Sequence, residues 1–254
     1  MIENSELDLP ILSTFDWNNW FIENDKNLLH IPYEDEDKLS DEEINMIKHS
    51  LQVWQLGEGS PGNNLRKQVK QYVEKNGRHD FAQVMEKLLM EEKRHSQLLS
   101  QFMSFHGIAL KNKMFIDNLF RFLRKIGGLQ CSIIMLITGE IIALSYYKAL
   151  SEITTSEVLP VICKQMIQDE LMHIALSSDT LYKFALENGS LKNGVVSRFR
   201  NVGLFIAVMI AWKHFKQIFI NSGCSFNSFY GTSKRLLNQS KQIVRNKLMV
   251  NSAL

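Results

Sequence analysis

The stretches EEKRH at residues 91–95 and DELMH at residues 169–173 repeat one pattern: two acids, two spacers and a histidine. In an α-helix, residues three apart lie on the same face, about one turn from each other. The second acid and the histidine of each stretch can therefore present a carboxylate and an imidazole to a common point. This geometry requires both stretches to be helical, so they predict the fold together with the chemistry. The residues concerned are Glu92, His95, Glu170 and His173.

The rest of the chain also reads as helical. Long stretches carry apolar residues at helical period, and 4 prolines without regularly spaced Val, Ile and Thr runs argue against an all-β fold. At 254 residues and 45% hydrophobic, the chain is large enough to bury a core. We therefore predict an all-α single domain over residues 1–254, with core helices at about 40–188 and extra helices at about 193–250.

Capping residues and glycines set the first boundaries. Ser40, followed by three acids, predicts the start of the first core helix. Gly and Pro residues at 59–62 predict a kink or interruption in that helix, and Asn76-Gly77 its end. Asp80 is expected to cap the second helix, which stops near Gly107.

The later boundaries follow in the same way. A third segment is expected from about Phe115 to Glu152, weakened at Gly127-Gly128. Thr155 and Ser156 are candidate caps for a fourth helix, which Asn188-Gly189 closes. A further helix is expected at about 195–221.

Charge and cysteine content exclude several classes. A net charge of +2 lacks the electrostatic footprint of a nucleic-acid-binding protein, and the basic residues near the C-terminus fit one solvated helix. The 3 cysteines form no C-x-x-C pair, which excludes a zinc ribbon and fits a reducing cytoplasm. The N-terminus lacks the features of a signal peptide, and the most apolar run, 202–212, is about half a membrane span. We expect a cytoplasmic protein that binds neither membrane nor nucleic acid.

A single glutamate precedes each motif by about the length of a helical hairpin: Glu58 ahead of Glu92, and Glu140 ahead of Glu170. In the second hairpin, Glu140 and Glu170 are each about 13 residues, or roughly 20 Å, from the turn that joins their helices. The two carboxylates should therefore lie at the same height along the bundle. In the first hairpin, Glu58 and Glu92 are about 17 and 13 residues from the turn. The break in the helix after Glu58 has to shorten the longer of these two distances for the carboxylates to lie at the same height.

Solvated helix faces are the alternative explanation for these acids. Against it, Glu140 lies within the apolar stretch 133–144, where a carboxylate needs something to pair with it. On the first helix, Glu43 and Glu74 lie several turns off the level of the motifs. Residues 57–62 could also form a phosphate-cradling loop, but no strand precedes them and no G-K-[ST] follows.

A glutamate on each of two helices, with Glu-x-x-His on each of two others, resembles the ferritin-like di-metal carboxylate superfamily over about 40–188. Residues 169–173, and Glu140 followed by Tyr146-Tyr147, are more similar to its acyl-carrier desaturases and ribonucleotide reductase small subunits. The resemblance implies a four-helix bundle with an additional N-terminal segment and C-terminal helices. It also implies two iron ions, with manganese as an alternative, because hard oxygen donors suit these metals. One ion would bind Glu58, Glu92 and His95, and the other Glu140, Glu170 and His173.

By the same resemblance, Glu91 and Asp169 would each accept a hydrogen bond from the imidazole of the opposite motif. Tyr147 and Trp54 could relay electrons or a radical, with core packing as the alternative. Leu99 stands one turn after His95, where a radical-storing reductase subunit would carry a tyrosine, so a stored tyrosyl radical is disfavoured.

These features favour an enzyme: a non-haem di-iron or iron–manganese oxidase or oxygenase that activates dioxygen to oxidise a small, largely apolar organic substrate. No redox cofactor motif is visible, so an external reductase or ferredoxin would supply electrons, and a monomer or homodimer is expected. The alternatives are a ferroxidase or other iron-handling protein, and a bundle that serves as an interaction scaffold.

Overall fold

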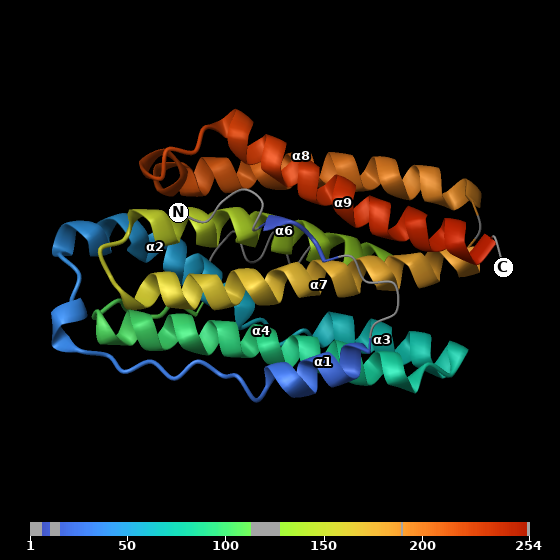
Figure 1. Ribbon diagram of the computed structural model, residues 1–254, viewed down its shortest axis with the longest axis horizontal. Helices are drawn as coiled ribbons and strands as arrows, with labels where there is room; N and C mark the ends of the chain where they lie inside the picture. Colours follow the sequence, from blue (N-terminus) through green and yellow to red (C-terminus); the bar gives the residue numbers. More distant parts are fainter. Residues whose placement is uncertain (1–6, 11–15, 113–127, 189, 253–254) are drawn as a thin grey trace. The chain divides into compact units, whose positions relative to one another are not determined.

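The computed structural model describes residues 7–10, 16–112, 128–188 and 190–252, and the regular structure within these ranges is entirely helical. The all-α prediction is confirmed for this part of the chain. The helices, labelled as in Figure 1, are α1 (Trp17–Asn24), η2 (Asp35–Asp37), α2 (Asp41–Glu58), α3 (Asn63–Asn76), α4 (His79–Phe105), α6 (Leu129–Ile153), α7 (Val158–Asn188), α8 (Ser190–Asn221) and α9 (Phe226–Ser252).

The chain divides into two compact units. The N-terminal unit comprises Asp16–Ser132 and Thr154–Ile162, and the C-terminal unit comprises Met1–Phe15, Ile133–Ile153 and Cys163–Leu254. The first unit contains α1 to α4, and the second contains most of α6 and α7 with all of α8 and α9. That the whole chain is one domain stays a prediction.

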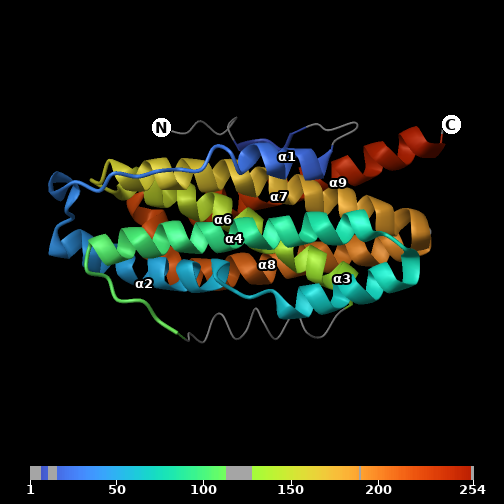
Figure 2. The same cartoon turned by 90° about the horizontal axis from the view of Figure 1, so that it is seen from below.

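In the N-terminal unit, α1, α2 and α3 all pack against α4. Figure 2 shows α2 and α3 following one another along α4. The predicted break between them is confirmed: α2 ends at Glu58, and Gly62 adopts a left-handed φ of 63° before α3 begins. A Cβ at Gly62 would lie 2.6 Å from Leu89 Cδ2 on α4, so a larger residue would strain the backbone and displace the leucine side chain.

Most predicted helix ends are observed. Ser40 Oγ accepts a hydrogen bond from Glu43 N at 3.2 Å, and Gly77 follows the end of α3 with a φ of 69°. The prediction that Asp80 caps the second helix is wrong. Arg78 is the N-cap, and Asp80 lies in the first turn with its carboxylate 3.5 Å from Arg78 Nε.

Glu43 shows how the N-terminal unit uses a buried carboxylate for structure. Its oxygens accept hydrogen bonds from Thr154 Oγ1 at 2.6 Å, Thr155 Oγ1 at 2.6 Å and Thr155 N at 3.0 Å. Ser156 Oγ in turn accepts from Leu159 N at 3.0 Å and caps the start of α7. Glu43 is thus committed to the α6–α7 loop, which agrees with its omission from the metal ligands.

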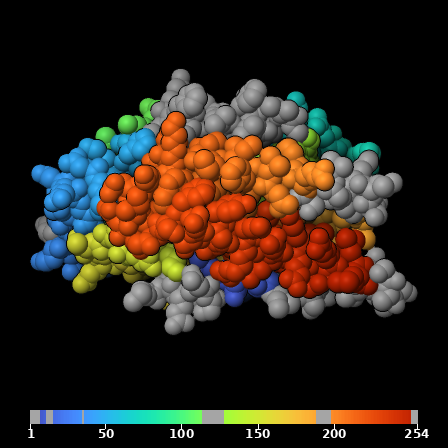
Figure 3. Space-filling model, turned by 90° about the horizontal axis from the view of Figure 1, so that it is seen from above, coloured from blue at the N-terminus to red at the C-terminus, as the bar shows by residue number. Residues whose placement is uncertain are grey.

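In the C-terminal unit, α8 and α9 pack along each other (Figure 1), and Figure 3 shows their adjoining surfaces in orange and red. Aromatic rings join them, with the centroids of Phe219 and Phe229 4.4 Å apart. The helix expected at 195–221 begins earlier, at Ser190, and ends as predicted. The third predicted segment begins, within the described residues, with α6 after Gly128, and its part at 115–127 lies outside them.

Two helical segments, Leu129–Ile153 and Arg198–Asn221, are long and apolar enough to cross a membrane by length and composition alone. The most apolar window of the first segment is 67% buried inside the protein, and that of the second segment is 39% buried. Core helices pass the same test, so the absence of a membrane span stays a prediction.

Candidate metal centre

Three of the predicted ligands belong to α2 and α4. Glu58 is the last residue of α2, and Glu92 and His95 lie one turn apart in the middle of α4. Glu58 is 6% exposed and His95 is 1% exposed. Glu92 is half-buried as a residue, but its Oε1 atom is inaccessible to solvent. All three donor groups are therefore withdrawn from water.

A close approach between α2 and α4 sets the position of Glu58. Gln55 Nε2 donates to Ser96 Oγ at 3.0 Å, and Ser96 Oγ donates to the Gln55 carbonyl at 2.9 Å. A Cβ at Gly59 would lie 2.7 Å from Ser96 Oγ, so a larger residue there would displace the serine hydroxyl and disturb its hydrogen bonds with Gln55. Sequence reasoning missed this contact, although Gly59 directly after Glu58 was a signal.

The other three ligands belong to α6 and α7. Glu170 and His173 are fully buried, and His173 Nδ1 lies 3.0 Å from Glu170 Oε2. The Glu-x-x-His spacing thus brings the two side chains together, as helical geometry requires. Glu140 is 4% exposed on α6, among the apolar residues Ile137, Ile141 and Leu144, which are fully buried.

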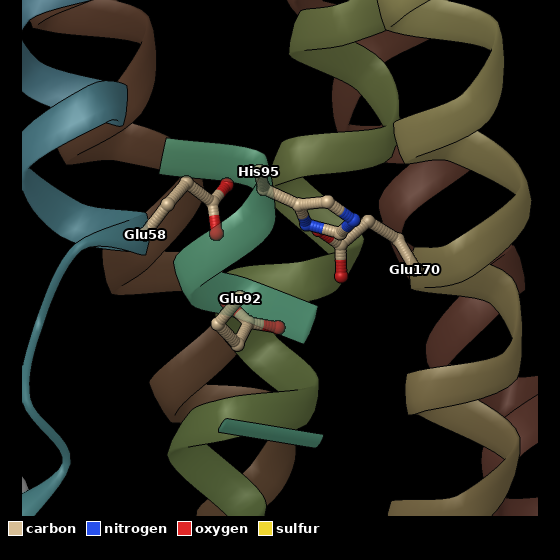
Figure 4. Close-up of side chains that lie close together, drawn as sticks. All are labelled: Glu58, Glu92, His95 and Glu170. Atoms are coloured by element: carbon tan, nitrogen blue, oxygen red, sulfur yellow. The ribbon is translucent and has the colours of Figure 1, made fainter. Parts of the chain in front are cut away.

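Ligand atoms from these residues gather into two overlapping groups. Within each group the candidate donor atoms all lie within 4.8 Å of one another. Figure 4 shows the first group, in which the carboxylates and the imidazole lie close together. Glu92 and Glu170 belong to both groups, whereas each histidine belongs to one. The first group is Glu58, Glu92, His95 and Glu170, and the second is Glu92, Glu140, Glu170 and His173.

The donor set fits hard divalent metal ions. Four carboxylates and two imidazoles provide oxygen and nitrogen donors and no thiolate, a composition that suits a divalent metal ion. Four negative charges would balance two divalent cations, and such balance is needed because a buried, uncompensated charge is costly. The buried cluster can therefore hold a metal ion.

Comparison with protein-family models, with curated proteins and with solved structures gave no match. The assignment of the site accordingly rests on the residues themselves: an all-helical chain with a buried glutamate and histidine cluster.

The two acids that precede the motif glutamates are buried and hydrogen-bonded. Glu91 Oε1 accepts from Asn24 Nδ2 at 2.6 Å and from Arg94 Nη2 at 2.5 Å, which connects α4 to the end of α1. Asp169 Oδ1 accepts from Gln165 Nε2 at 3.0 Å. Both act as acceptors, and their bonds to the histidines of the opposite motifs stay a prediction.

The two aromatic relay candidates differ in environment. Tyr147 is fully buried on α6, two turns after Glu140, and its ring centroid lies 5.2 Å from that of Tyr146. Tyr146 in turn lies 5.5 Å from Phe215 on α8. Trp54 is half-buried on α2, one turn before Glu58. These contacts are those of a packed core, and an electron-relay role stays a prediction for both residues.

Proposed function

We propose that this chain binds two iron or manganese ions in a ferritin-like four-helix arrangement of α2, α4, α6 and α7. The observation that carries the proposal is the sharing of Glu92 and Glu170 between the two donor groups. Two carboxylates common to both groups are what a pair of ions joined by bridging glutamates would need.

Each residue then has a distinct task. Glu58 and His95 would hold one ion, Glu140 and His173 would hold the other, and Glu92 and Glu170 would contribute a carboxylate to each. The imidazole of His173, whose Nδ1 lies 3.0 Å from Glu170 Oε2, would provide a nitrogen donor to its ion.

We further propose that the site is an oxidase or oxygenase acting on a small, largely apolar organic substrate. Bound iron would supply the one-electron chemistry that lets dioxygen react with such a substrate. The chain's own contribution is to exclude water. Glu140 stands on α6 between the fully buried residues Ile137, Ile141 and Leu144, and a helix with so apolar a sequence suits an organic substrate better than a stream of hydrated ferrous ions.

Anaerobic titration of the metal-free protein with ferrous iron tests the proposal, followed by the optical spectrum after a pulse of dioxygen. We expect saturation near two irons per chain and a new near-ultraviolet absorption after the pulse. No iron binding would overturn the metal site. Continued oxidation of many ferrous ions per chain would overturn the oxygenase assignment in favour of iron handling.

A further inference from the structure

A buried arginine lies in the C-terminal unit, in a part that the proposed reaction does not use. Arg200 on α8 is 4% exposed, and its Nη2 donates to Ser240 Oγ on α9 at 2.6 Å. Ser240 Oγ lies 2.5 Å from Ser178 Oγ on α7, and Ser178 Oγ donates to the Ile174 carbonyl at 2.7 Å. The guanidinium is thus held by a chain of hydroxyl groups that ends at an uncharged carbonyl oxygen.

A second cation lies beside this arginine. Lys241 follows Ser240 on α9, and its Nζ donates to Asn201 Oδ1 at 2.6 Å. Burial, together with the positive charges of Arg200 and Arg245, lowers the pKa of Lys241 to about 8. Burial alone lowers the pKa of Arg200 to about 10. The acceptors that these two cations have among the described residues are uncharged, and Arg200 Nε has no hydrogen-bond partner there.

Asp179, the acid that directly follows Ser178 on α7, forms ion pairs with other cations. The Asp179 carboxylate binds Lys247 Nζ at 2.5 Å and Lys183 Nζ at 3.1 Å. Its charge is thus shared by these two lysines. Within the described ranges, the cluster of Arg200, Ser240 and Lys241 therefore carries two positive charges and no acidic partner, with Arg200 buried and Lys241 half-buried.

The buried Arg200 guanidinium has no counter-ion among the described residues, which is unfavourable, and its planar N–H groups match the two oxygens of a carboxylate. We propose that the cluster of Arg200, Ser240 and Lys241 binds the carboxylate of an organic acid. A single planar group of two oxygens fits the few donors of the cluster, whereas a phosphate would bring further oxygens that need donors of their own.

Along the axis of α7, the site lies about one and a half turns from one proposed metal ligand. Ser178 is five residues after His173 on α7, a rise of about 7.5 Å. Ser177, one turn after His173, is 1% exposed, and its hydroxyl has no hydrogen-bond partner within the described ranges. An acid held at Arg200 would extend past Ser177 toward His173. This step rests on the proposed function and names its substrate class: a monocarboxylic acid with an apolar chain.

Thermal unfolding of the metal-free protein at constant ionic strength tests the site, with sodium hexanoate, sodium phosphate and sodium chloride as probes. We expect hexanoate to raise the midpoint of wild type, and the affinity to fall at least tenfold in Arg200→Gln. Arg198→Gln is the matched control, since it removes an equal charge from an exposed position two residues earlier and should keep the full response. Ser240→Ala provides a second variant that should weaken the response, should Arg200→Gln fail to fold.

Three results would overturn the assignment. These are no response of wild type to hexanoate, an equal response in the Arg200 and Arg198 variants, and an Arg200-dependent response to phosphate alone. Without hexanoate, Arg200→Gln should be at least as stable as wild type, because it removes a buried charge that has no counter-ion in the part of the chain that the structure describes. The hexanoate measurement uses the metal-free protein, so its result does not depend on whether the chain binds iron. The iron titration uses no hexanoate, so a failure of either experiment leaves the result of the other unchanged.

Discussion

Replacing the shared and unshared glutamates one at a time should give two different losses of metal. Glu92 and Glu170 belong to both donor groups, whereas Glu58 and Glu140 each belong to one. Glu→Gln keeps the size of the side chain and removes its charge. We therefore expect Glu58→Gln and Glu140→Gln to bind one iron, and Glu92→Gln and Glu170→Gln to bind almost none.

The expected sizes follow from linkage between binding and unfolding. A ligand at 100 times its Kd stabilises the folded state by about 2.7 kcal/mol per site. Two filled sites would add about 5 kcal/mol, of which the unshared variants should keep about half and the shared variants almost nothing. For a chain of this size, about 2.7 kcal/mol corresponds to roughly 5–10 °C in the unfolding midpoint.

Calorimetric unfolding with and without ferrous iron, kept anaerobic, measures these differences beside the binding stoichiometry. Glu152→Gln is the control, because Glu152 is an exposed glutamate on α6, the helix that carries Glu140. In the metal-free state the four variants should be no less stable than wild type, since each removes a buried negative charge. Two irons bound to Glu170→Gln, or equal losses in all four variants, would refute the shared-ligand argument.

Three further predictions concern other parts of the chain. Gly77→Ala should lower the unfolding free energy by about 1 kcal/mol because of its left-handed backbone alone, and Gly62→Ala by about 2 kcal/mol because its Cβ also displaces Leu89. Urea denaturation measures both losses, and equal losses would refute the close approach of Gly62 to α4. The affinity for hexanoate should fall as pH rises through about 8, where Lys241 loses its proton beside the two neighbouring arginines, and a flat calorimetric profile would exclude the lysine from the site. Burial raises the pKa of the Cys163 thiol and hides it, so a thiol reagent should modify Cys163 only after unfolding; its rapid modification in the native protein would contradict the packing.

Much of the helical layout could be predicted because its signals are local. Ser40 caps α2, Gly77 ends α3 and Ser156 caps α7 through hydrogen bonds between residues close in sequence. Asp80 misled the prediction because aspartate is favourable both at the N-cap and in the first turn of a helix, so the residue type alone does not distinguish the two positions. Only the backbone conformation at Arg78 distinguishes them.

The candidate metal centre could be predicted because spacing along a helix fixes which side chains meet. The Glu170–His173 contact follows from an interval of three residues. The Gln55–Ser96 contact and the Arg200–Ser240 pair could not be predicted in the same way, since each joins helices far apart in sequence. Arginine is usually exposed to solvent, so the sequence predicts an exposed side chain at Arg200, and only tertiary packing buries it.

The place of Glu58 at the very end of α2 has a consequence for local opening of the chain. The carbonyl groups of a helix's last turn point outward and give that end partial negative charge, so a carboxylate there adds repulsion unless a cation lies between them. The Gly59 amide, bonded to the Gln55 carbonyl at 3.1 Å, belongs to this last turn. Its exchange with deuterium should therefore be fast in the metal-free protein and slow when a cation is bound, which makes the fraying of a single helix end a residue-level measure of metal occupancy.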